Sequence, residues 1–223
     1  MAGFLMIKAV LFDFDGVVVD SEPVHHRTFM QFLKPLGISV DEKRWYREFA
    51  GTGSRNIFTV LLGEAGITDA KKIEEYVEKR KKAYGGLVEK GEVKAKAGVG
   101  EFLKMLRGNG IKTAVVSGGH RENIILALSV LGLGKYFDSI IGSGDYEKRK
   151  PYPDAFLEAA KRLGVKPAEC LAFEDSVSGF KAAKSAGMKV VLARSPAVEY
   201  IDRNEALAVI KDFRNFPLSL LKS

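Results

Sequence analysis

The chain has 223 residues, of which 46% are hydrophobic and 28% charged. This balance excludes a disordered protein and is typical of a soluble globular one. Its 35 basic and 28 acidic side chains give a net charge of +7, which suits an anionic ligand. No hydrophobic run approaches the roughly 20 residues of a membrane span, and residues 1–12 lack the features of a signal peptide. We therefore expect a cytoplasmic protein with no membrane partner.

Two features of the composition allow more than one interpretation. Cys170 is the single cysteine, which excludes an intramolecular disulfide; its hydrophobic neighbours favour a core position over a catalytic thiol. Residues 71–96 are rich in lysine, but glutamates are mixed among the lysines. That mixture favours a solvated helix face over a nucleic-acid patch, so we expect no nucleic-acid partner.

Short hydrophobic runs of strand length alternate with helical patterns over most of the chain. Strands are predicted at Ile7–Phe12, Thr113–Val116, Ser139–Ile141, Cys170–Phe173 and Val190–Leu192. Helices are predicted at Glu101–Arg107, Glu122–Leu131, Asp154–Leu163 and Ser176–Ala186. This alternation predicts an α/β fold with a parallel sheet and helices on its faces.

Residues 21–96 interrupt the alternation, because only helical patterns occur there. These patterns are His26–Leu36, Asp41–Phe49, Arg55–Ala65 and Lys71–Tyr84. We predict a small all-helical domain at 21–96, inserted after the first strand into a core made of residues 1–20 and 97–223. Gly85–Gly86 and Ala97–Gly100 are expected to mark the return to the core. An insert at this position would cover the carboxyl ends of the strands, where open α/β folds bind ligands.

Two aspartates follow the first predicted strand. Strand alternation places Asp13 and Asp15 on one face and Phe12 and Phe14 on the other. Two carboxylates so close together repel each other unless a cation or a shared proton lies between them, and Mg²⁺ prefers oxygen ligands of this kind. A pair of turn or capping aspartates is the alternative interpretation.

A second acidic pair, Glu174 and Asp175, follows the predicted strand that ends at Phe173. Carboxylates from two strand ends indicate one metal site, although Asp175 alone could equally be the N-cap of the helix that begins near Ser176. Ser117 closes another strand and precedes Gly118, whose backbone amide could approach a phosphate; a simple Ser-Gly turn is the alternative.

Lys150 immediately precedes Pro151, which favours an extended backbone at the lysine and so restricts where its ammonium group can point. Such a lysine can neutralise phosphate oxygens and hold the Asp13 carboxylate. Lys148 and Arg149 are its neighbours, and on spacing alone any of the three could be a surface charge.

These stretches occur in an order that resembles the haloacid dehalogenase superfamily. They are DFDGV with Asp13 and Asp15, VVSGG with Ser117, KP with Lys150, and FEDS with Glu174 and Asp175. The resemblance implies a Rossmann-like core with a mobile cap. It implies that Asp13 attacks phosphorus to form an aspartyl phosphate and that Asp15 is the general acid and base, with a pKa raised by burial.

The resemblance also assigns the ligands. Asp13, the Asp15 carbonyl and Asp175 are similar to the Mg²⁺ ligands, with Glu174 bound directly or behind them, and Ser117 and Lys150 would hold the phosphoryl group. Asp15 favours phosphoester chemistry, because the dehalogenases and phosphonate hydrolases of the superfamily lack an aspartate there. We therefore expect a small phosphorylated metabolite as substrate, and a monomer or weak dimer.

The closest subgroup by pattern is the β-phosphoglucomutase-like proteins, which include phosphatases of sugar phosphates and phosphoglycolate. His25 in the hinge region, and Arg55 and Lys81 in the insert, match residues of the mutase that serve the hinge and the substrate; all three could also be packed or surface residues. After Ser117 this chain has His120 and Arg121 in place of the mutase residues for a second phosphate, and Arg121 is a candidate replacement. We expect hydrolysis, with a mutase as the alternative and a non-enzymatic nucleic-acid-binding module as a remote one.

Overall fold

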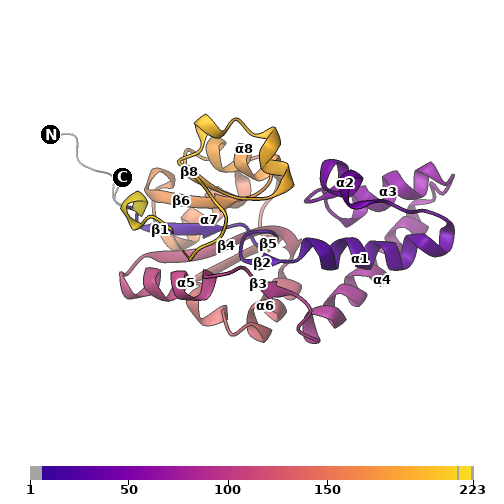
Figure 1. The fold of residues 1–223 in the computed structure, drawn as a ribbon, viewed down its shortest axis with the longest axis horizontal. Helices are drawn as coiled ribbons and strands as arrows, with labels where there is room; N and C mark the ends of the chain where they lie inside the picture. The colour runs from indigo at the N-terminus through magenta and orange to yellow at the C-terminus, as the bar shows by residue number, and fades with distance from the viewer. Residues whose placement is uncertain (1–6, 215, 222–223) are drawn as a thin grey trace.

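The computed structural model describes residues 7–214 and 216–221. Its centre is a sheet of six parallel strands in the order β5-β4-β1-β6-β7-β8 (Figure 1). The strands are β1 (Ala9–Phe12), β4 (Lys112–His120), β5 (Ser139–Ser143), β6 (Cys170–Glu174), β7 (Lys189–Ala193) and β8 (Ala208–Ile210). The predicted parallel α/β sheet is confirmed, whereas β8 was not predicted.

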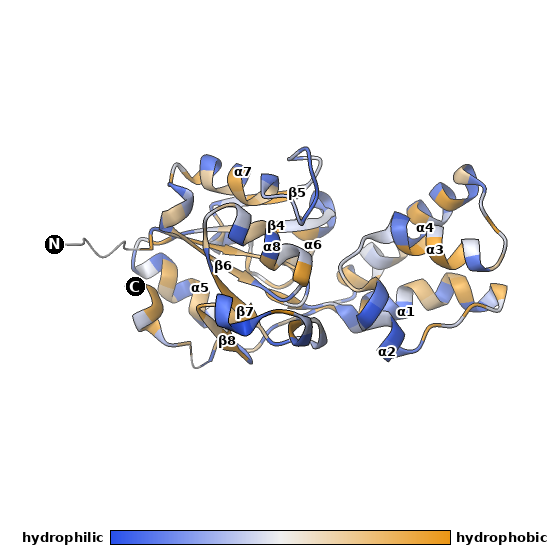
Figure 2. Cartoon of the chain, turned by 90° about the horizontal axis from the view of Figure 1, so that it is seen from above, coloured by the Kyte–Doolittle hydropathy of each residue, from blue (hydrophilic) through white to orange (hydrophobic). Residues whose placement is uncertain are grey.

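Helices cover both faces of the sheet, and each face has its own hydrophobic cluster. They are α5 (Val99–Gly108), α6 (Arg121–Val130), α7 (Asp154–Leu163) and α8 (Val177–Ser185). One cluster, here called the α5/α6 cluster, joins the sheet to α5, α6 and the C-terminal segment; the other joins it to α7 and α8. Figure 2 shows the strands as the most hydrophobic part of the core.

Aromatic rings lie directly beneath the carboxyl ends of the two central strands. The ring of Phe12, at the end of β1, stacks on that of Phe173 in β6, with a centroid distance of 5.2 Å and an angle of 7°. Phe213, from the C-terminal segment, packs against both rings. Phe14 belongs to the same cluster, as the predicted alternation requires. These contacts fix the positions of the residues that follow each strand.

The helices within residues 21–96 form a unit beside the sheet, here called the cap (Figure 1). Its helices are α1 (Glu22–Leu33), α2 (Glu42–Arg44), the π-helix η2 (Trp45–Phe49), α3 (Ser54–Glu64) and α4 (Ala70–Glu89). They enclose a cluster centred on Trp45, Phe29 and Phe58, here called the cap cluster. A separate cluster for these helices supports the predicted insert, and we keep its boundaries as a proposal.

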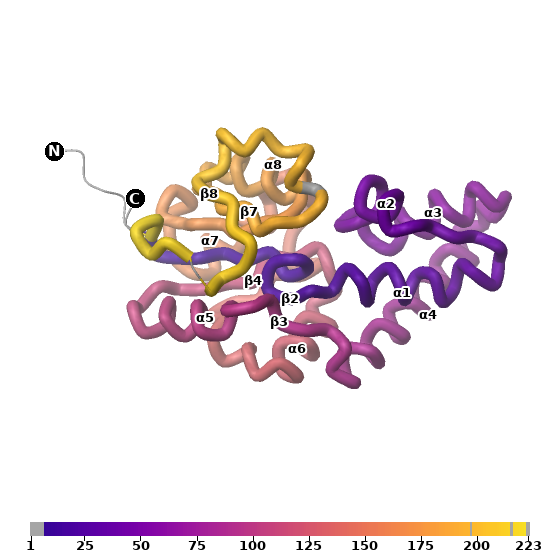
Figure 3. The backbone as a smooth tube through the Cα atoms, viewed as in Figure 1, coloured from indigo at the N-terminus to yellow at the C-terminus, as the bar shows by residue number. Residues whose placement is uncertain are grey.

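The two connections between cap and core pair with each other. The strands β2 (Val19–Asp20) and β3 (Lys94–Ala95) form an antiparallel ribbon, and the Lys96 ammonium lies 3.2 Å from Asp20 Oδ1. Figure 3 shows the chain leaving and re-entering the core at this ribbon. Two-residue strands have too few alternating positions to be recognised in the sequence.

The structure corrects two expected boundaries. Helix α1 begins at Glu22 rather than His26, because Pro23 suits the first turn, where no backbone N–H is needed. Gly85 and Gly86 do not mark the return to the core; they lie inside α4, which continues to Glu89. Buried Tyr84 and Val88 pack on either side of the glycines, so tertiary contacts outweigh the low helix propensity. In the described part of the chain, no helix has the length and hydrophobicity to cross a membrane.

Candidate active site

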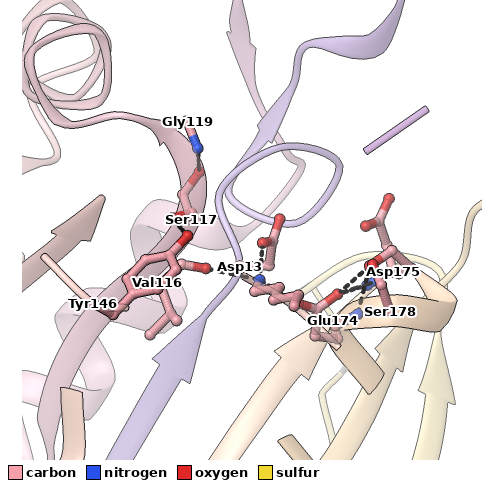
Figure 4. Close-up of polar contacts among 11 residues, drawn as sticks. Asp13, Val116, Ser117, Gly119, Tyr146, Glu174, Asp175 and Ser178 are labelled. Atoms are coloured by element: carbon pink, nitrogen blue, oxygen red, sulfur yellow. Dashed lines mark hydrogen bonds and ion pairs between the residues drawn. The ribbon is translucent and has the colours of Figure 1, made fainter. Parts of the chain in front are cut away.

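The predicted site residues gather at the carboxyl edge of the sheet, after adjacent strands. Asp13 follows β1, Ser117 lies in β4, and Glu174 ends β6; β4 and β6 flank β1. Lys150 comes from the loop after β5. Figure 4 shows the carboxyl groups of Asp13 and Asp175 directed away from the sheet, beyond the ends of its strands. The two acidic pairs therefore meet at one edge.

Lys150 links three parts of this edge. Its Nζ donates to Asp13 Oδ1 at 2.5 Å, to Glu174 Oε1 at 2.6 Å and to the carbonyl of Val116 at 3.0 Å. Its side chain is only 10% exposed, and that of Glu174 is 0% exposed. Burial alone would lower the pKa of Lys150, but the carboxylates of Asp13 and Glu174 outweigh it and raise the pKa. The lysine is therefore a permanent cation beside Asp13.

Glu174 uses both carboxylate oxygens within the protein. Oε1 accepts from Lys150, while Oε2 accepts from the backbone N–H groups of Asp175 and Ser176 and from the Ser176 hydroxyl. A Cβ at Gly179 would lie 1.8 Å from Oε1, so the residue at that position must be glycine. The N-cap of α8 is Ser176, whose hydroxyl accepts from Gly179 N; Asp175 is therefore not the cap.

Asp175 lies against the loop that carries Asp15. Gly16 has φ +80°, and a Cβ there would lie 2.0 Å from Asp175 Oδ2. Burial raises the pKa values of both Asp13 and Asp175 well above the ordinary value. Lys150 opposes this rise, whereas the neighbouring carboxylates add to it. Three carboxylates around one lysine leave an excess of negative charge, which a divalent cation would neutralise.

Within the described residues, no three acidic, histidine or cysteine side chains converge to form a complete metal site. Mg²⁺ does not require one, because it commonly keeps several waters and is bound by one or two carboxylates together with substrate phosphate. Asp13 and Asp175, with the Asp15 carbonyl next to Gly16, fit that donor set. Glu174 is already occupied, which favours an indirect role for it.

Ser117 faces the same edge from β4. Its Oγ accepts from Gly119 N at 2.9 Å, and its carbonyl accepts from the Tyr146 hydroxyl at 3.2 Å. A Cβ at Gly119 would lie 3.9 Å from Asp15 Oδ2, so this loop and Asp15 are near neighbours. Gly118 is exposed, and its backbone is accessible to a ligand. The Ser117 hydroxyl proton remains available to a phosphate oxygen.

Asp15 is bound to the cap. Its Oδ1 accepts from Ser21 Oγ at 2.5 Å and lies 3.0 Å from His25 Nε2. Burial alone would raise the pKa of Asp15, but His25, Ser21 and the charge of Arg80 lower it below the ordinary value. The expectation of a raised pKa is therefore wrong for this arrangement, because His25, Ser21 and Arg80 favour the charged form of Asp15 and no local sequence pattern indicates these contacts.

Arg80 is a buried cation that was not predicted as a site residue. Its Nη2 contacts His25 Nδ1, and its guanidinium lies between the rings of Phe29 and Tyr84, at 4.5 and 4.9 Å from their centroids. Burial lowers its pKa to about 10, so it stays charged at neutral pH. Because arginine can only donate, His25 Nδ1 accepts and Nε2 carries the proton that it donates to Asp15. Arg80 was not predicted because it lies in a lysine-rich stretch that is typical of a solvated helix face.

Of the other residues predicted to bind substrate, only some lie near the site. His25 lies at the site, as just described. Arg55 forms an exposed ion pair with Glu74 within the cap. Arg121 contacts the Ile140 carbonyl and Asp145 on the core. Lys81 is partly buried and has no side-chain ion pair or hydrogen bond among the described residues.

A search against protein-family models matches residues 7–187 to the haloacid dehalogenase-like hydrolases. The chain belongs to this family. The match covers the cap and the strands that carry Asp13, Ser117 and Glu174, so the predicted family and fold are confirmed. Together with the relatives described next, it also supports the predicted class of phosphoric monoester hydrolases.

Two relatives of this hydrolase match it over about four fifths of their own length. It is 35% identical to the protein YhcW of Bacillus subtilis (strain 168) over 189 residues, which are 84% of this chain and 83% of that protein. It is 31% identical to the 6-phosphogluconate phosphatase of Escherichia coli (strain K12) over 82% of this chain and 81% of that protein. Among solved structures, a β-phosphoglucomutase from Clostridium difficile is similar with a TM-score of 0.84 and 25% identity, covering 97% and 96% of the two chains. The hydrolase therefore resembles both sugar phosphatases and phosphomutases.

Proposed function

We propose that this hydrolase is a Mg²⁺-dependent phosphatase of a small phosphomonoester and that it acts through a phosphorylated Asp13. The observation that carries the proposal is the 2.5 Å contact between Asp13 Oδ1 and Lys150 Nζ at the end of the central strand. A buried ammonium group there orients the carboxylate and offsets the negative charge of an approaching phosphate. Ser117 and the Gly118 amide provide further donors on the neighbouring strand.

In the first step, a carboxylate oxygen of Asp13 forms a bond to phosphorus while the bond from phosphorus to the ester oxygen breaks. The departing oxygen takes a proton from Asp15 and leaves as an alcohol. In the second step, water attacks the phosphorus of the aspartyl phosphate, Asp15 takes a proton from that water, and the Asp13 carboxylate is released with phosphate. Protons and charges balance over the two steps.

The contacts of Asp15 suggest how it serves both steps. Ser21 and His25 stabilise it as a carboxylate, the form needed to accept a proton from water. For the first step it must carry a proton, and we propose that it gains one when it leaves Ser21 and His25 and turns toward the substrate. Arg80 is then a positioning residue, because it fixes the tautomer of His25.

Mg²⁺, when bound by Asp13, Asp175 and the Asp15 carbonyl, would neutralise the charge of the phosphate oxygens and reduce their repulsion from Asp13. The excess of carboxylates at this edge supports that role. Glu174 would act indirectly by holding Lys150 and the first turn of α8 in place.

Unpaired cations at the boundary of cap and core support a substrate with a second acidic group. Arg149 has no side-chain partner among the described residues, and a Cβ at Gly53 in the cap would lie 3.2 Å from its Nη1. Burial and the charges of Lys81 and Arg149 lower the pKa of His120 against the opposing charges of Glu122 and Glu78, so Lys81, Arg149 and His120 lie near one another. A phosphorylated sugar acid has the charges to match this region, whereas Arg55 and Arg121 are engaged elsewhere.

The test is phosphate release from a panel of sugar phosphates, phosphorylated sugar acids, phosphoglycolate and nucleotides, with and without Mg²⁺. Wild-type enzyme should release phosphate only with the metal, and acid-quenched samples should contain the phosphorylated peptide of Asp13. Asp13→Asn should lose turnover and the adduct; near-normal turnover in this variant would reject the nucleophile. Conversion of β-glucose 1-phosphate to glucose 6-phosphate with a bisphosphate activator would favour the mutase instead.

A further inference from the structure

Helix α4 packs against both parts of the molecule. Ile73 and Val77, in its first half, belong to the cap cluster, whereas Tyr84 and Val88, in its second half, belong to the α5/α6 cluster. Near the same end, a Cβ at Gly85 would lie 3.7 Å from Asn123 Oδ1 of α6. Figure 3 shows α4 running from the far side of the cap to the helices of the core. Any rotation of the cap must therefore be absorbed within α4 or at its contact with α6.

Two adjacent glycines lie where α4 reaches the core. Glycine is the least favourable residue for a helix interior after proline, so its presence twice in succession needs a reason. Packing does not provide one: a Cβ at Gly86 would meet nothing within 4 Å, and a Cβ at Gly85 would make an ordinary contact. Neither residue has a positive φ. The remaining effect of two adjacent glycines is that the helix bends more easily at this point.

The other attachment of the cap is comparatively fixed. The ribbon of β2 and β3 is held by backbone pairing and by the ion pair between Lys96 and Asp20. If the cap turns about this ribbon, the end of α4 that is packed on α6 cannot follow it without bending.

We infer that Gly85 and Gly86 are the hinge at which α4 bends when the cap opens and closes over the site. The part of α4 that carries Arg80 then moves with the cap, together with the His25 that Arg80 contacts. Residues after the pair stay with the core. The inference rests on the proposed function in one respect, namely that turnover requires the cap to move so that Asp15 can leave His25.

The test is to stiffen the helix with the double substitution Gly85→Ala and Gly86→Ala. Because alanine favours the helix and has room at both positions, Tm should rise by about 2–6 °C. Turnover should nevertheless fall by about three- to tenfold, because the bent form is disfavoured by the same preference. Gly63→Ala in α3 is the matched control, since a Cβ there also meets nothing within 4 Å. It should raise Tm and leave turnover unchanged.

A distance measurement makes the inference independent of catalysis. Spin labels on Lys71→Cys in the cap and Lys104→Cys in the core, in a Cys170→Ala background, report the opening of the cap. Wild-type distances should change when Mg²⁺ and orthovanadate are added, and the double alanine variant should show a narrower distribution and a smaller change. Equal turnover and equal distances in the two proteins would overturn the hinge. Absence of phosphate release by wild-type enzyme would instead reject the proposed function, and the widths of the distance distributions without ligand would still test the hinge.

Discussion

The carboxylate of Asp15 lies 3.0 Å from Nε2 of His25, so a residue of the core loop is bound directly to the first helix of the cap. Arg80 contacts the other ring nitrogen of the same histidine. One imidazole ring therefore connects the cap to Asp15, the proposed acid and base. A movement that separates α1 from the loop after β1 would also change which proton donors Asp15 meets.

Substitution of His25 should separate its hydrogen bond from its packing. His25→Phe keeps a ring to stack on Tyr84, which lies 4.4 Å from the imidazole centroid, but cannot donate to Asp15. Loss of one hydrogen bond of about 1.4 kcal/mol corresponds to a fall in kcat of about tenfold. His25→Gln retains a donor and should keep more activity. Steady-state kinetics would decide, and equal activity of the two variants would show that the donor is unimportant.

Lys150→Met should destabilise the metal-free protein strongly. The substitution leaves the buried Asp13 and Glu174 carboxylates without their shared cation, and removing one partner from a buried ion pair costs about 3–5 kcal/mol. Denaturant unfolding would measure the loss. Lys148→Met is a suitable control, because Lys148 is exposed and contacts the Tyr152 ring. A cost below about 1 kcal/mol for Lys150→Met would contradict the ion-pair account.

Stabilisation by Mg²⁺ should grow as the pH rises. Burial raises the pKa values of Asp13 and Asp175 in the folded protein above 3.8. A carboxyl group whose pKa is higher in the folded than in the unfolded protein stabilises the fold when the pH lies below the pKa of the unfolded state. This stabilisation is lost as the pH rises through the pKa of the folded state. Mg²⁺ binds the ionised form and should restore about 2.7 kcal/mol at a hundredfold excess over its Kd. Thermal melts at pH 5 and pH 8, with and without Mg²⁺, provide the measurement.

The control for this prediction is Asp175→Asn. Removing one of the repelling carboxylates should make the metal-free protein less sensitive to pH and should reduce the Mg²⁺ effect at pH 8. An Mg²⁺ effect of the same size at both pH values would argue that the ion binds elsewhere.

Arg149→Gln should affect substrates according to their charge. Loss of a charge interaction near the surface of about 0.7–1.4 kcal/mol corresponds to a rise in KM of about three- to tenfold for a phosphorylated sugar acid. A neutral sugar phosphate should show little change. Comparison of kcat/KM for the two substrate classes is the measurement, with Lys148→Gln as the control. A uniform effect on both classes would rule out recognition of a second acidic group by Arg149.

The sequence was sufficient for five of the six strands of the sheet and for the positions of the residues at its edge, because hydrophobic strands followed by acidic or glycine-rich turns are local patterns. Lys150 contacts Asp13 and Glu174, and Ser117 lies in the neighbouring strand β4, since the carboxyl ends of neighbouring parallel strands lie together; the roles of these residues stay a prediction. The contacts of the cap with the core could not be predicted in this way. They depend on how α1 and α4 pack, which no local pattern specifies.

Arg80 and the glycine pair of α4 illustrate that limit. Arg80 looks like a surface residue among lysines, yet the helix turns it inward between Phe29 and Tyr84. The glycines indicate a break in the sequence, but the hydrophobic residues around them hold the helix together. The lowered pKa of Asp15 follows from the same packing, because Ser21 and His25 reach it only once the cap is in place.

The ribbon of β2 and β3 brings the two ends of the cap side by side. An inserted segment whose ends already meet can be replaced by one of another length or shape without disturbing the strands of the sheet, since the entropy of closing a loop changes only slowly with its length. The carboxylates and the lysine at the sheet edge are therefore encoded outside the stretch that forms the cap. An exchanged stretch would preserve the proposed reaction only if it again supplied partners for Asp15, as His25 and Arg80 do here.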